Sequence, residues 1–410
     1  MKRVLLLLVV VAFVASGMSP WATAVRASDP VKPFVVTFLF AESWTDGGWN
    51  MAHKVGVDQL KSLGTVIKEW DNGFLVELPD KRQIQVNLVT NVGYGSEIET
   101  TMRSALEEQK PDMLFGTWYN AKDAIAELAP KYPNVKFEHA SGYPLLKSAD
   151  FKNVSTYFIK QEDGDYVMGY VSGLMGFDKI GLVATIPIPE PVRGINAFAL
   201  GQQKGLKEAG KDPKQAEVRV VWIQSWLDAP KEREAAEGLL GAGYKVIRQM
   251  PDTPTASMAA CDRGATAIGY GSDVSAKAPC AIGTNTWQWG TYYKQRVLDA
   301  MDGKWVPADW YKGFDADAVG LVFGKGVDAA IQAKATKLAE DLKAGKVDPF
   351  DGPVAGQGKE KDTGKQLAIS VPAGKRLSDM ERLSMQWTVD GVKSELPDFV
   401  PSTPTVIEVK

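Results

Sequence analysis

Short apolar stretches rich in β-branched and aromatic residues recur along the chain from residue 34 onwards. Stretches of this length and composition are typical of strands buried in a parallel sheet. The pattern predicts ten strands, at residues 34–40, 84–89, 113–117, 135–138, 154–158, 180–185, 218–223, 246–249, 266–269 and 281–284.

Between these strands, apolar residues recur at a spacing of three and four, which is typical of helices with one buried face. The predicted helices are residues 49–63, 98–106, 121–128, 235–240 and 292–301. Strands that alternate with helices of this length form right-handed β-α-β units and parallel sheets covered on both faces. Ten strands would make one sheet long, so we predict an α/β protein with two lobes, divided near residues 153–157.

The last 60 residues have a different composition. Residues 345–363 are rich in Gly, Lys and Asp, and only short segments such as residues 380–387 have the pattern of ordered structure. We expect an extended tail that wraps the lobes, with a mobile segment as the alternative.

The first residues have the order of a secretory signal. A basic head, Met1-Lys2-Arg3, precedes an unbroken apolar run of 12 residues from Val4 to Ala15. That run is too short to cross a bilayer, which takes about 20 apolar residues. Two small-residue sites are suitable for cleavage of a signal peptide, one ending at Ala24 and one at Ala27. Because no Cys lies nearby, we expect a periplasmic protein without a lipid anchor.

Composition and charge exclude several classes of function. The 410 residues have a net charge of −3, which lacks the basic footprint of a nucleic-acid-binding protein. Two His and two Cys without ligand spacing do not make the usual zinc site. Cys261 and Cys280 are expected to be separate buried thiols, although an oxidising compartment permits a bridge between them.

Catalytic signatures are missing from the sequence. It contains no nucleophile elbow, Walker loop, dinucleotide fingerprint or His-Glu-x-x-His motif. Acidic pairs such as Glu232 and Glu234 fit a charged helix face. We therefore predict a binding protein that is not an enzyme and uses no cofactor or metal.

Tryptophan and tyrosine cluster where predicted strands end. Ligands of open parallel sheets bind beyond the carboxyl ends of the strands, so side chains at these positions converge on one cleft. Together they predict a slot for a flat ring, since aromatic pairs contribute roughly 0.5–1.5 kcal/mol each beyond area burial. The alternative for each one alone is a core position. The residues are Trp44, Trp49, Trp118, Tyr119, Trp222, Trp226, Trp287 and Trp289.

Polar residues stand at the same strand ends. Asp46 can cap the helix that follows the first strand, which places Trp49 and Asn50 in its first turn and His53 on the face of Trp49. Asp252 and Asp273 also follow strands and could accept hydrogen bonds from ring or exocyclic N–H groups. A cap or turn role is the alternative for each Asp.

Four ordered segments resemble the signature segments of the basic membrane protein family, the purine-nucleoside receptors of ABC importers. The resemblance covers about residues 34–350, and phrases such as Ile188-Pro189-Glu190 and Trp289-Gly290 are similar to a tryptophan-rich, non-lipidated branch with a long C-terminal tail. The four segments are Asp46-Gly47-Gly48-Trp49-Asn50, Tyr132-Pro133-Asn134-Val135-Lys136-Phe137, Gln161-Glu162-Asp163-Gly164-Asp165-Tyr166 with Gly169, and Ser225-Trp226-Leu227-Asp228.

The resemblance implies a type I periplasmic-binding-protein fold. This fold has two Rossmann-like lobes with parallel sheets and a three-stranded hinge, and it closes on a purine held between two aromatic side chains. Those positions are Trp49 and Trp226 here. The expected domains are a signal peptide at 1–27, an N-terminal lobe at 28–155 with about 284–322, a C-terminal lobe at 156–283 with about 323–349, and an extension at 350–410.

Two departures from the family pattern bear on the ligand. Gly271 stands where the nucleoside receptors carry an Asp that holds the ribose hydroxyls, and Trp287 stands where they place a sugar-binding Lys. Buried sugar hydroxyls without partners would cost about 1–3 kcal/mol each, which favours a free nucleobase such as adenine. An alignment shifted by two residues would instead place Asp273 at the first position and weaken this inference.

The sequence thus predicts a monomeric periplasmic receptor that hands a planar heteroaromatic ligand to an inner-membrane ABC permease and binds no nucleic acid. The alternatives are a receptor for a purine nucleoside or another planar cofactor, and a secreted nucleoside hydrolase. The expected ligand-binding residues are Trp49, Asn50, His53, Tyr119, Glu190, Trp226, Asp252, Asp273 and Trp289.

Overall fold

The computed structural model describes residues 32–143, 145–395, 398–399 and 405–409. The predicted signal peptide, residues 1–27, lies outside the described residues. Within them, no helix is both long enough and apolar enough to cross a membrane.

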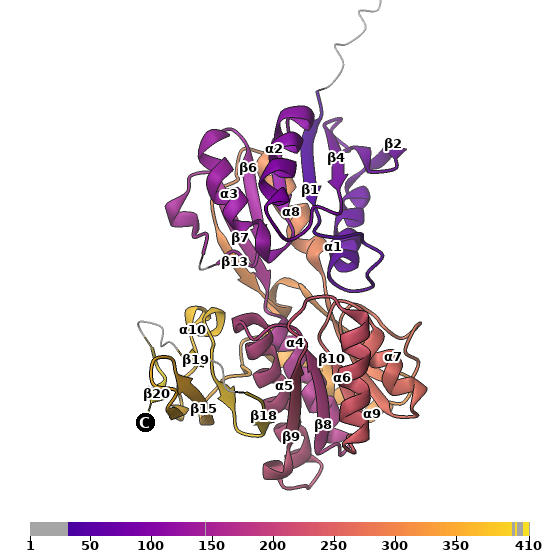
Figure 1. Ribbon diagram of the computed structural model, residues 1–410. Coiled ribbons are helices and arrows are strands. Elements are labelled where there is room, and N and C mark those ends of the chain that lie inside the picture. Colours follow the sequence, from indigo (N-terminus) through magenta and orange to yellow (C-terminus); the bar gives the residue numbers. More distant parts are fainter. Residues whose placement is uncertain (1–31, 144, 396–397, 400–404, 410) are drawn as a thin grey trace, which may run out of the picture. The chain divides into compact units, whose positions relative to one another are not determined.

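The first lobe is built on an eight-stranded sheet with the order β13-β7-β6-β5-β1-β4-β3-β2 (Figure 1). Pairing is parallel from β13 to β4 and antiparallel between β4, β3 and β2. The strands are β1 (Phe34–Leu39), β2 (Thr65–Trp70), β3 (Gly73–Glu77), β4 (Gln83–Val89), β5 (Met113–Gly116), β6 (Lys136–Ala140), β7 (Val154–Ile159) and β13 (Asp309–Lys312).

Helices cover both faces of this sheet. Adjacent residues of β1 enter different cores: Phe38 belongs to the core that includes Val57 and Tyr293, and Leu39 to the core that includes Ile98. A strand buried on both faces accounts for the unbroken apolar run. The helices are α1 (Trp49–Asp58), α2 (Glu97–Gln109), α3 (Lys122–Leu128) and α8 (Trp289–Met301), with short 3-10 helices η1 (Gln59–Leu63), η2 (Tyr119–Ala121), η3 (Ala129–Lys131) and η4 (Ser148–Asp150).

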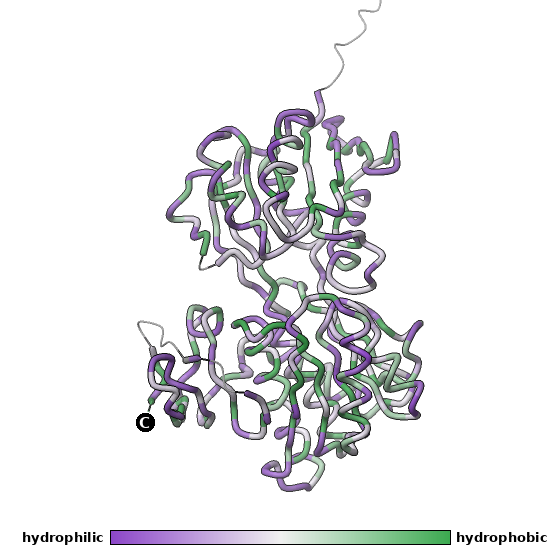
Figure 2. Tube along the Cα trace, in the orientation of Figure 1, coloured by the Kyte–Doolittle hydropathy of each residue, from purple (hydrophilic) through white to green (hydrophobic). Residues whose placement is uncertain are grey.

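The second lobe has a seven-stranded sheet with the order β14-β12-β11-β10-β8-β9-β18, in which only the β12–β14 pair is antiparallel. In Figure 2 its strands contain long hydrophobic segments. The strands are β8 (Lys179–Ala184), β9 (Glu217–Trp222), β10 (Val246–Gln249), β11 (Thr266–Gly271), β12 (Ala281–Trp287), β14 (Val319–Phe323) and β18 (Val392–Lys393). The helices are α4 (Gln161–Leu174), α5 (Pro189–Glu208), α6 (Ala229–Gly241), α7 (Thr255–Asp262) and α9 (Ala329–Lys343), with η5 (Pro213–Gln215) and η6 (Phe314–Ala316).

Among the described residues the chain passes between the two sheets three times, as a type I periplasmic-binding fold requires. The first passage follows Ile159 of β7, and the second follows Trp287 of β12. The third lies between Lys312 of β13 and Val319 of β14. The boundaries expected after residues 155, 283 and 322 fall inside β7, β12 and β14. Each of these strands pairs along its length within one sheet, so the change of lobe comes at a strand end.

The C-terminal extension forms a third sheet and is attached to the second lobe. The side-chain amide of Asn196 on α5 donates to the Trp387 carbonyl at 2.7 Å and accepts from the Val389 backbone N–H at 3.0 Å. In addition, β18 continues the second sheet beside β9. The elements are β15 (Val354–Glu360), β16 (Gln366–Val371), α10 (Asp379–Leu383), β17 (Thr388–Val389), β19 (Asp398–Phe399) and β20 (Glu408–Val409).

Cys261 and Cys280 form a disulfide, which corrects the expectation of two separate thiols. Cys261 lies in the last turn of α7 and Cys280 just before β12, and their Cα atoms are 5.4 Å apart. Spacing along the sequence could not reveal that the β-α-β connection brings these two positions together.

Candidate functional site

A cavity of about 730 Å³ lies where strands of both sheets end. This is the position at which open α/β sheets bind ligands. Its lining includes residues just beyond β1, β5, β8, β9 and β10, as well as the end of β12. The lining residues include Trp49, Trp118, Tyr119, Tyr143, Thr156, Phe158, Thr185, Glu190, Arg193, Trp226, Asp252, Tyr270, Trp287, Asp309, Trp310, Tyr311, Asp379, Met380, Leu383, Ser384 and Gln386.

Trp49, in the first turn of α1, is held in a fixed orientation. Its indole N–H donates to the Thr117 carbonyl at 2.8 Å, and its ring meets Trp287 edge to face with centroids 4.9 Å apart. Asp46 supports this turn, since its carboxylate accepts from the backbone N–H groups of Asn50 and Met51 at 2.8 and 2.9 Å. The helix itself begins at Trp49, after Gly48.

Trp226 reaches the same cavity from the second lobe. It lies in the loop between β9 and α6, is half-buried, and its carbonyl accepts from the Asp252 backbone N–H at 3.0 Å. The two indoles predicted to hold a planar ligand therefore line one cavity from two lobes.

Two carboxyl groups, those of the half-buried Glu190 and the buried Asp252, line the cavity and form no ion pair among the described residues. Tyr270 donates its hydroxyl to Glu190 at 3.1 Å, and burial raises the pKa of Glu190 against the opposing influence of Arg193. Burial, with added repulsion from Asp46 and Glu190, raises the pKa of Asp252 well above its ordinary value. Among the described residues no donor lies within hydrogen-bond distance of the Asp252 carboxylate. Its oxygens are free to accept from a ligand.

Arg193 brings a cation to the cavity, but its charge is matched within the protein. The Arg193 Nε lies 3.4 Å from Glu162, and the guanidinium lies 5.1 Å from the centre of the Phe158 ring. A guanidinium already paired and stacked is a poor site for an anionic ligand. The cavity instead offers aromatic faces and acceptor oxygens.

Three buried donor groups in the cavity lining have no hydrogen-bond partner within the described ranges. They are the indole N–H groups of Trp118 and Trp287 and the hydroxyl of Thr185. Buried polar groups are normally paired, so these groups are candidates for bonds to ligand acceptors.

Of the nine expected ligand-binding residues, five line the cavity and four do not. The five that do are Trp49, Tyr119, Glu190, Trp226 and Asp252. The other four, Asn50, His53, Asp273 and Trp289, are outside its lining.

The side chains of those four residues either contact other parts of the protein or are exposed outside the cavity. The Asn50 amide donates to Asp46 at 2.9 Å within the first turn of α1. His53 stacks on the wholly buried Trp289 at 4.3 Å, and burial lowers its pKa well below its ordinary value. Asp273 is exposed and accepts from the Ser275 backbone N–H at 2.9 Å. The position of a residue on a helical face or at a strand end does not show whether its side chain lines the cavity or packs in the layer beneath the lining.

Several lining residues were not expected. Tyr270 is the last residue but one of β11, so the strand-end rule that selected the tryptophans could have found it. Trp310 and Tyr311 belong to β13, which the sequence pattern did not predict as a strand. Met380 and Leu383 come from the extension, far along the chain, and no local pattern connects them with the cavity.

The topology of the two lobes and the position of the cavity are those of a type I periplasmic-binding fold. Solved structures support the fold: a solute-binding protein of Aeropyrum pernix K1 has a TM-score of 0.62 at 16% identity, covering 78% of this chain and 94% of that one. Another, from Conexibacter woesei DSM 14684, has a TM-score of 0.58 at 21% identity, covering 77% and 97%.

The sequence comparisons identify a more specific group than the fold does. The family described as "ABC transporter substrate-binding protein PnrA-like" matches residues 35–347, and the chain belongs to this family. A purine-binding protein of Brucella abortus (strain 2308) is 31% identical over 377 residues, covering 91% of this chain and 96% of that protein. A putative ABC transporter glucose-binding protein of Haloferax volcanii is 30% identical over 244 residues, 59% of each chain.

Proposed function

We propose that the chain binds a purine-type nucleobase, adenine-like, between Trp49 and Trp226 and delivers it to an inner-membrane ABC permease. The observation that carries this proposal is that one indole from each lobe lines the same cavity. The purine-binding relative, which aligns over nearly its whole length, supports the same ligand class.

The polar groups of the cavity fit the edge of a purine. The carboxylates of Asp252 and Glu190 can accept from exocyclic amino and ring N–H groups. The unpaired N–H groups of Trp118 and Trp287 and the hydroxyl of Thr185 can donate to ring nitrogens. Such bonds set the orientation of the ring, whereas stacking provides affinity for any flat ring.

A purine nucleoside is the second candidate. Two cavity carboxyl groups, Asp252 and Glu190, could hold ribose hydroxyls in place of the Asp that Gly271 replaces. We favour the free base because Trp287 replaces the sugar-binding Lys, and because Asp273, the alternative for the missing Asp, is exposed outside the cavity lining.

Calorimetric titration of adenine and adenosine against the wild type and Trp226→Ala tests this proposal. Removing the indole should weaken adenine binding by about 1–3 kcal/mol, a factor of about ten to a hundred. Trp70→Ala is the matched control, since Trp70 is exposed on β2 and does not line the cavity. Unchanged affinity in Trp226→Ala would remove that residue from the site, and tighter binding of adenosine would favour the nucleoside.

Export is part of the same proposal. The basic head and apolar run at residues 1–27 would direct the chain to the periplasm and be removed after Ala24 or Ala27, leaving a monomeric receptor. N-terminal sequencing of the mature protein and its mass in solution test these two points.

A further inference from the structure

The cavity lining falls into two groups according to the elements that carry it. One group, the strand-end group, lies at or just beyond the ends of β1, β5, β9, β10 and β12, and its members include Trp49, Trp118, Trp226, Asp252 and Trp287. The second group comes from the first lobe near β6 and β13 and from the C-terminal extension: Tyr143, Trp310, Met380 and Leu383. The Tyr143 hydroxyl lies 3.4 Å from the Met380 sulfur, so the first lobe and the extension meet at this part of the cavity.

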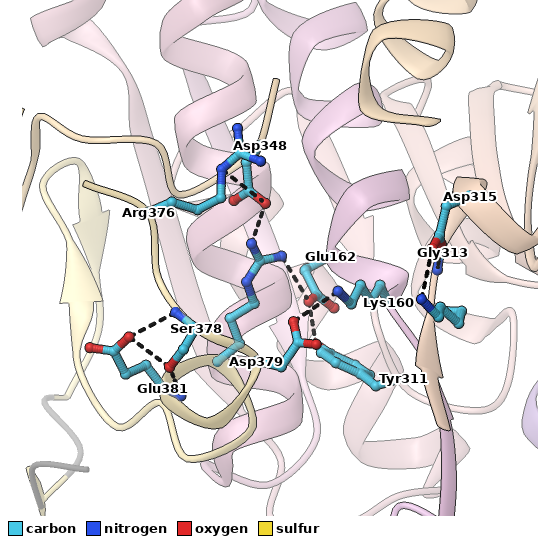
Figure 3. A network of polar contacts seen from close by, with 12 residues as sticks. Lys160, Glu162, Tyr311, Gly313, Asp315, Asp348, Arg376, Ser378, Asp379 and Glu381 are labelled. Atoms are coloured by element: carbon cyan, nitrogen blue, oxygen red, sulfur yellow. Dashed lines mark hydrogen bonds and ion pairs between the residues drawn. The ribbon is translucent and has the colours of Figure 1, made fainter. Parts of the chain in front are cut away.

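The extension is fixed in this position by polar contacts. Asp379 on α10 forms an ion pair with Lys160 at 2.8 Å, drawn as a dashed line in Figure 3. The buried Arg382 pairs with Asp348 and lies 3.9 Å from Glu162. A capping box between Ser378 and Glu381 begins α10. The segment is therefore held as a wall of the cavity.

Several polar groups near this wall already have partners, whereas the Gln386 amide and the Trp310 indole N–H have no hydrogen-bond partner among the described residues. Asp309 accepts from Ser148 and from Thr156, the latter at 2.8 Å. Asp379 is paired with Lys160, and the Ser384 hydroxyl donates to the Met380 carbonyl at 2.7 Å. This differs from the strand-end group, where Asp252 and two indole N–H groups have free capacity. What the wall offers a ligand is chiefly the thioether, the leucine and the aromatic faces, together with the Gln386 amide and the Trp310 N–H.

The cavity is large enough to hold a second group beside a nucleobase. Cavities of about 300–1,000 Å³ enclose drug-sized ligands, and a bare nucleobase is smaller than such ligands. At about 730 Å³, the cavity has room beyond a base stacked at Trp49 and Trp226.

We propose that Met380 and Leu383, with Tyr143 and Trp310, form a subsite for an apolar substituent carried by the purine-type ring. The preferred ligand is then a substituted nucleobase whose alkyl or aryl group packs against the C-terminal extension. This inference rests on the proposed function and names the ligand class of the same site.

Titration of the full chain with adenine, N6-benzyladenine, 9-benzyladenine and adenosine tests the subsite. At least one benzyl derivative should bind about tenfold more tightly than adenine, because burying an apolar group of that size is worth at least one factor of ten. The double variant Met380→Ala/Leu383→Ala should remove most of that gain and weaken the benzyl derivative far more than it weakens adenine.

The controls separate the possible failures. Lys375→Ala, an exposed position of the extension outside the cavity lining, should change nothing, and thermal unfolding of each variant reports whether it is folded. If adenine binds and neither benzyl derivative binds more tightly, the subsite is refuted and the proposed function stands. Equal weakening of adenine and its benzyl derivatives by the double variant also refutes the subsite. If no purine binds, the proposed function fails and the subsite with it.

Discussion

The ring of Trp287 occupies the space that a side chain at Gly271 would need. An ideal Cβ on Gly271 would lie 2.2 Å from Cζ3 of Trp287, and Gly271 has a φ of +76°, a conformation that other residues rarely adopt. These are the two positions that the family resemblance identifies as departures bearing on the ligand. The departures are therefore coupled, because the indole at 287 fits only beside a glycine at 271.

Gly271→Ala should lower the free energy of unfolding by about 1–3 kcal/mol, through the positive φ and the overlap with Trp287. In Gly271→Ala/Trp287→Ala the overlap is gone, so the combined loss should be smaller than the sum of the two single losses. Urea unfolding of the four proteins measures this coupling. Additive losses would show that the two positions are independent.

Gly48→Ala should impair closure of the two lobes. An ideal Cβ on Gly48, just before α1, would lie 2.0 Å from the Asp252 carbonyl oxygen in the second lobe. We expect adenine affinity to fall at least about tenfold, since closure can no longer assemble both indoles around the ring. Stability should change little, because an open arrangement relieves the overlap.

Small-angle scattering with and without adenine tests that expectation. The wild type should become more compact on binding, whereas Gly48→Ala should not. Gly238→Ala on α6 is the matched control, since a Cβ there meets nothing within 4 Å. Normal compaction and affinity in Gly48→Ala would contradict a role of this contact in closure.

Adenine binding should weaken as the pH falls through the raised pKa of Asp252. Burial favours the neutral acid, and protonation removes an acceptor that the ring N–H groups need. Asp252→Asn should bind adenine more weakly at neutral pH and show a flatter pH profile. Titrations across the acidic to neutral range measure this effect, with Asp273→Asn as an exposed control. A pH profile unchanged in Asp252→Asn would assign the dependence to another group.

Glu232 should make the protein less stable as the pH rises. Burial raises its pKa from 4.5 to about 7, even though Thr253 and the Asp228 backbone N–H donate to it. Between these values the folded protein keeps a proton that the unfolded chain has lost, so stability falls across this window and is level above it. Glu232→Gln should be more stable than the wild type above pH 7 and similar near pH 4.5. Equal stability at both would contradict the raised pKa.

The fold was largely predictable because buried parallel strands have a strong sequence signal. All ten predicted strands overlap strands of the two sheets. The pattern missed five strands of these sheets: β2, whose residues are mostly exposed, and also β3, β13, β14 and β18. It gave no means of placing the extension, because α10 reaches the cavity through contacts with residues hundreds of positions away, such as Tyr143.

The sequence predicted where in the fold the candidate site lies, but not which of the residues there line the cavity and which are buried beneath them. The strand-end rule placed Trp49, Trp226 and Asp252 at the cavity. The same rule selected Trp289, which packs beneath Trp49 with ring centroids 5.5 Å apart. Sequence spacing indicates which edge of a sheet a residue occupies, whereas burial depends on the layer that covers it.

A crystal structure of the full protein with adenine tests the central claim most directly. The account predicts the purine ring between the indoles of Trp49 and Trp226, with a ring or exocyclic N–H group donating to Asp252. A ring bound elsewhere in the cavity, or stacked on neither indole, would contradict it.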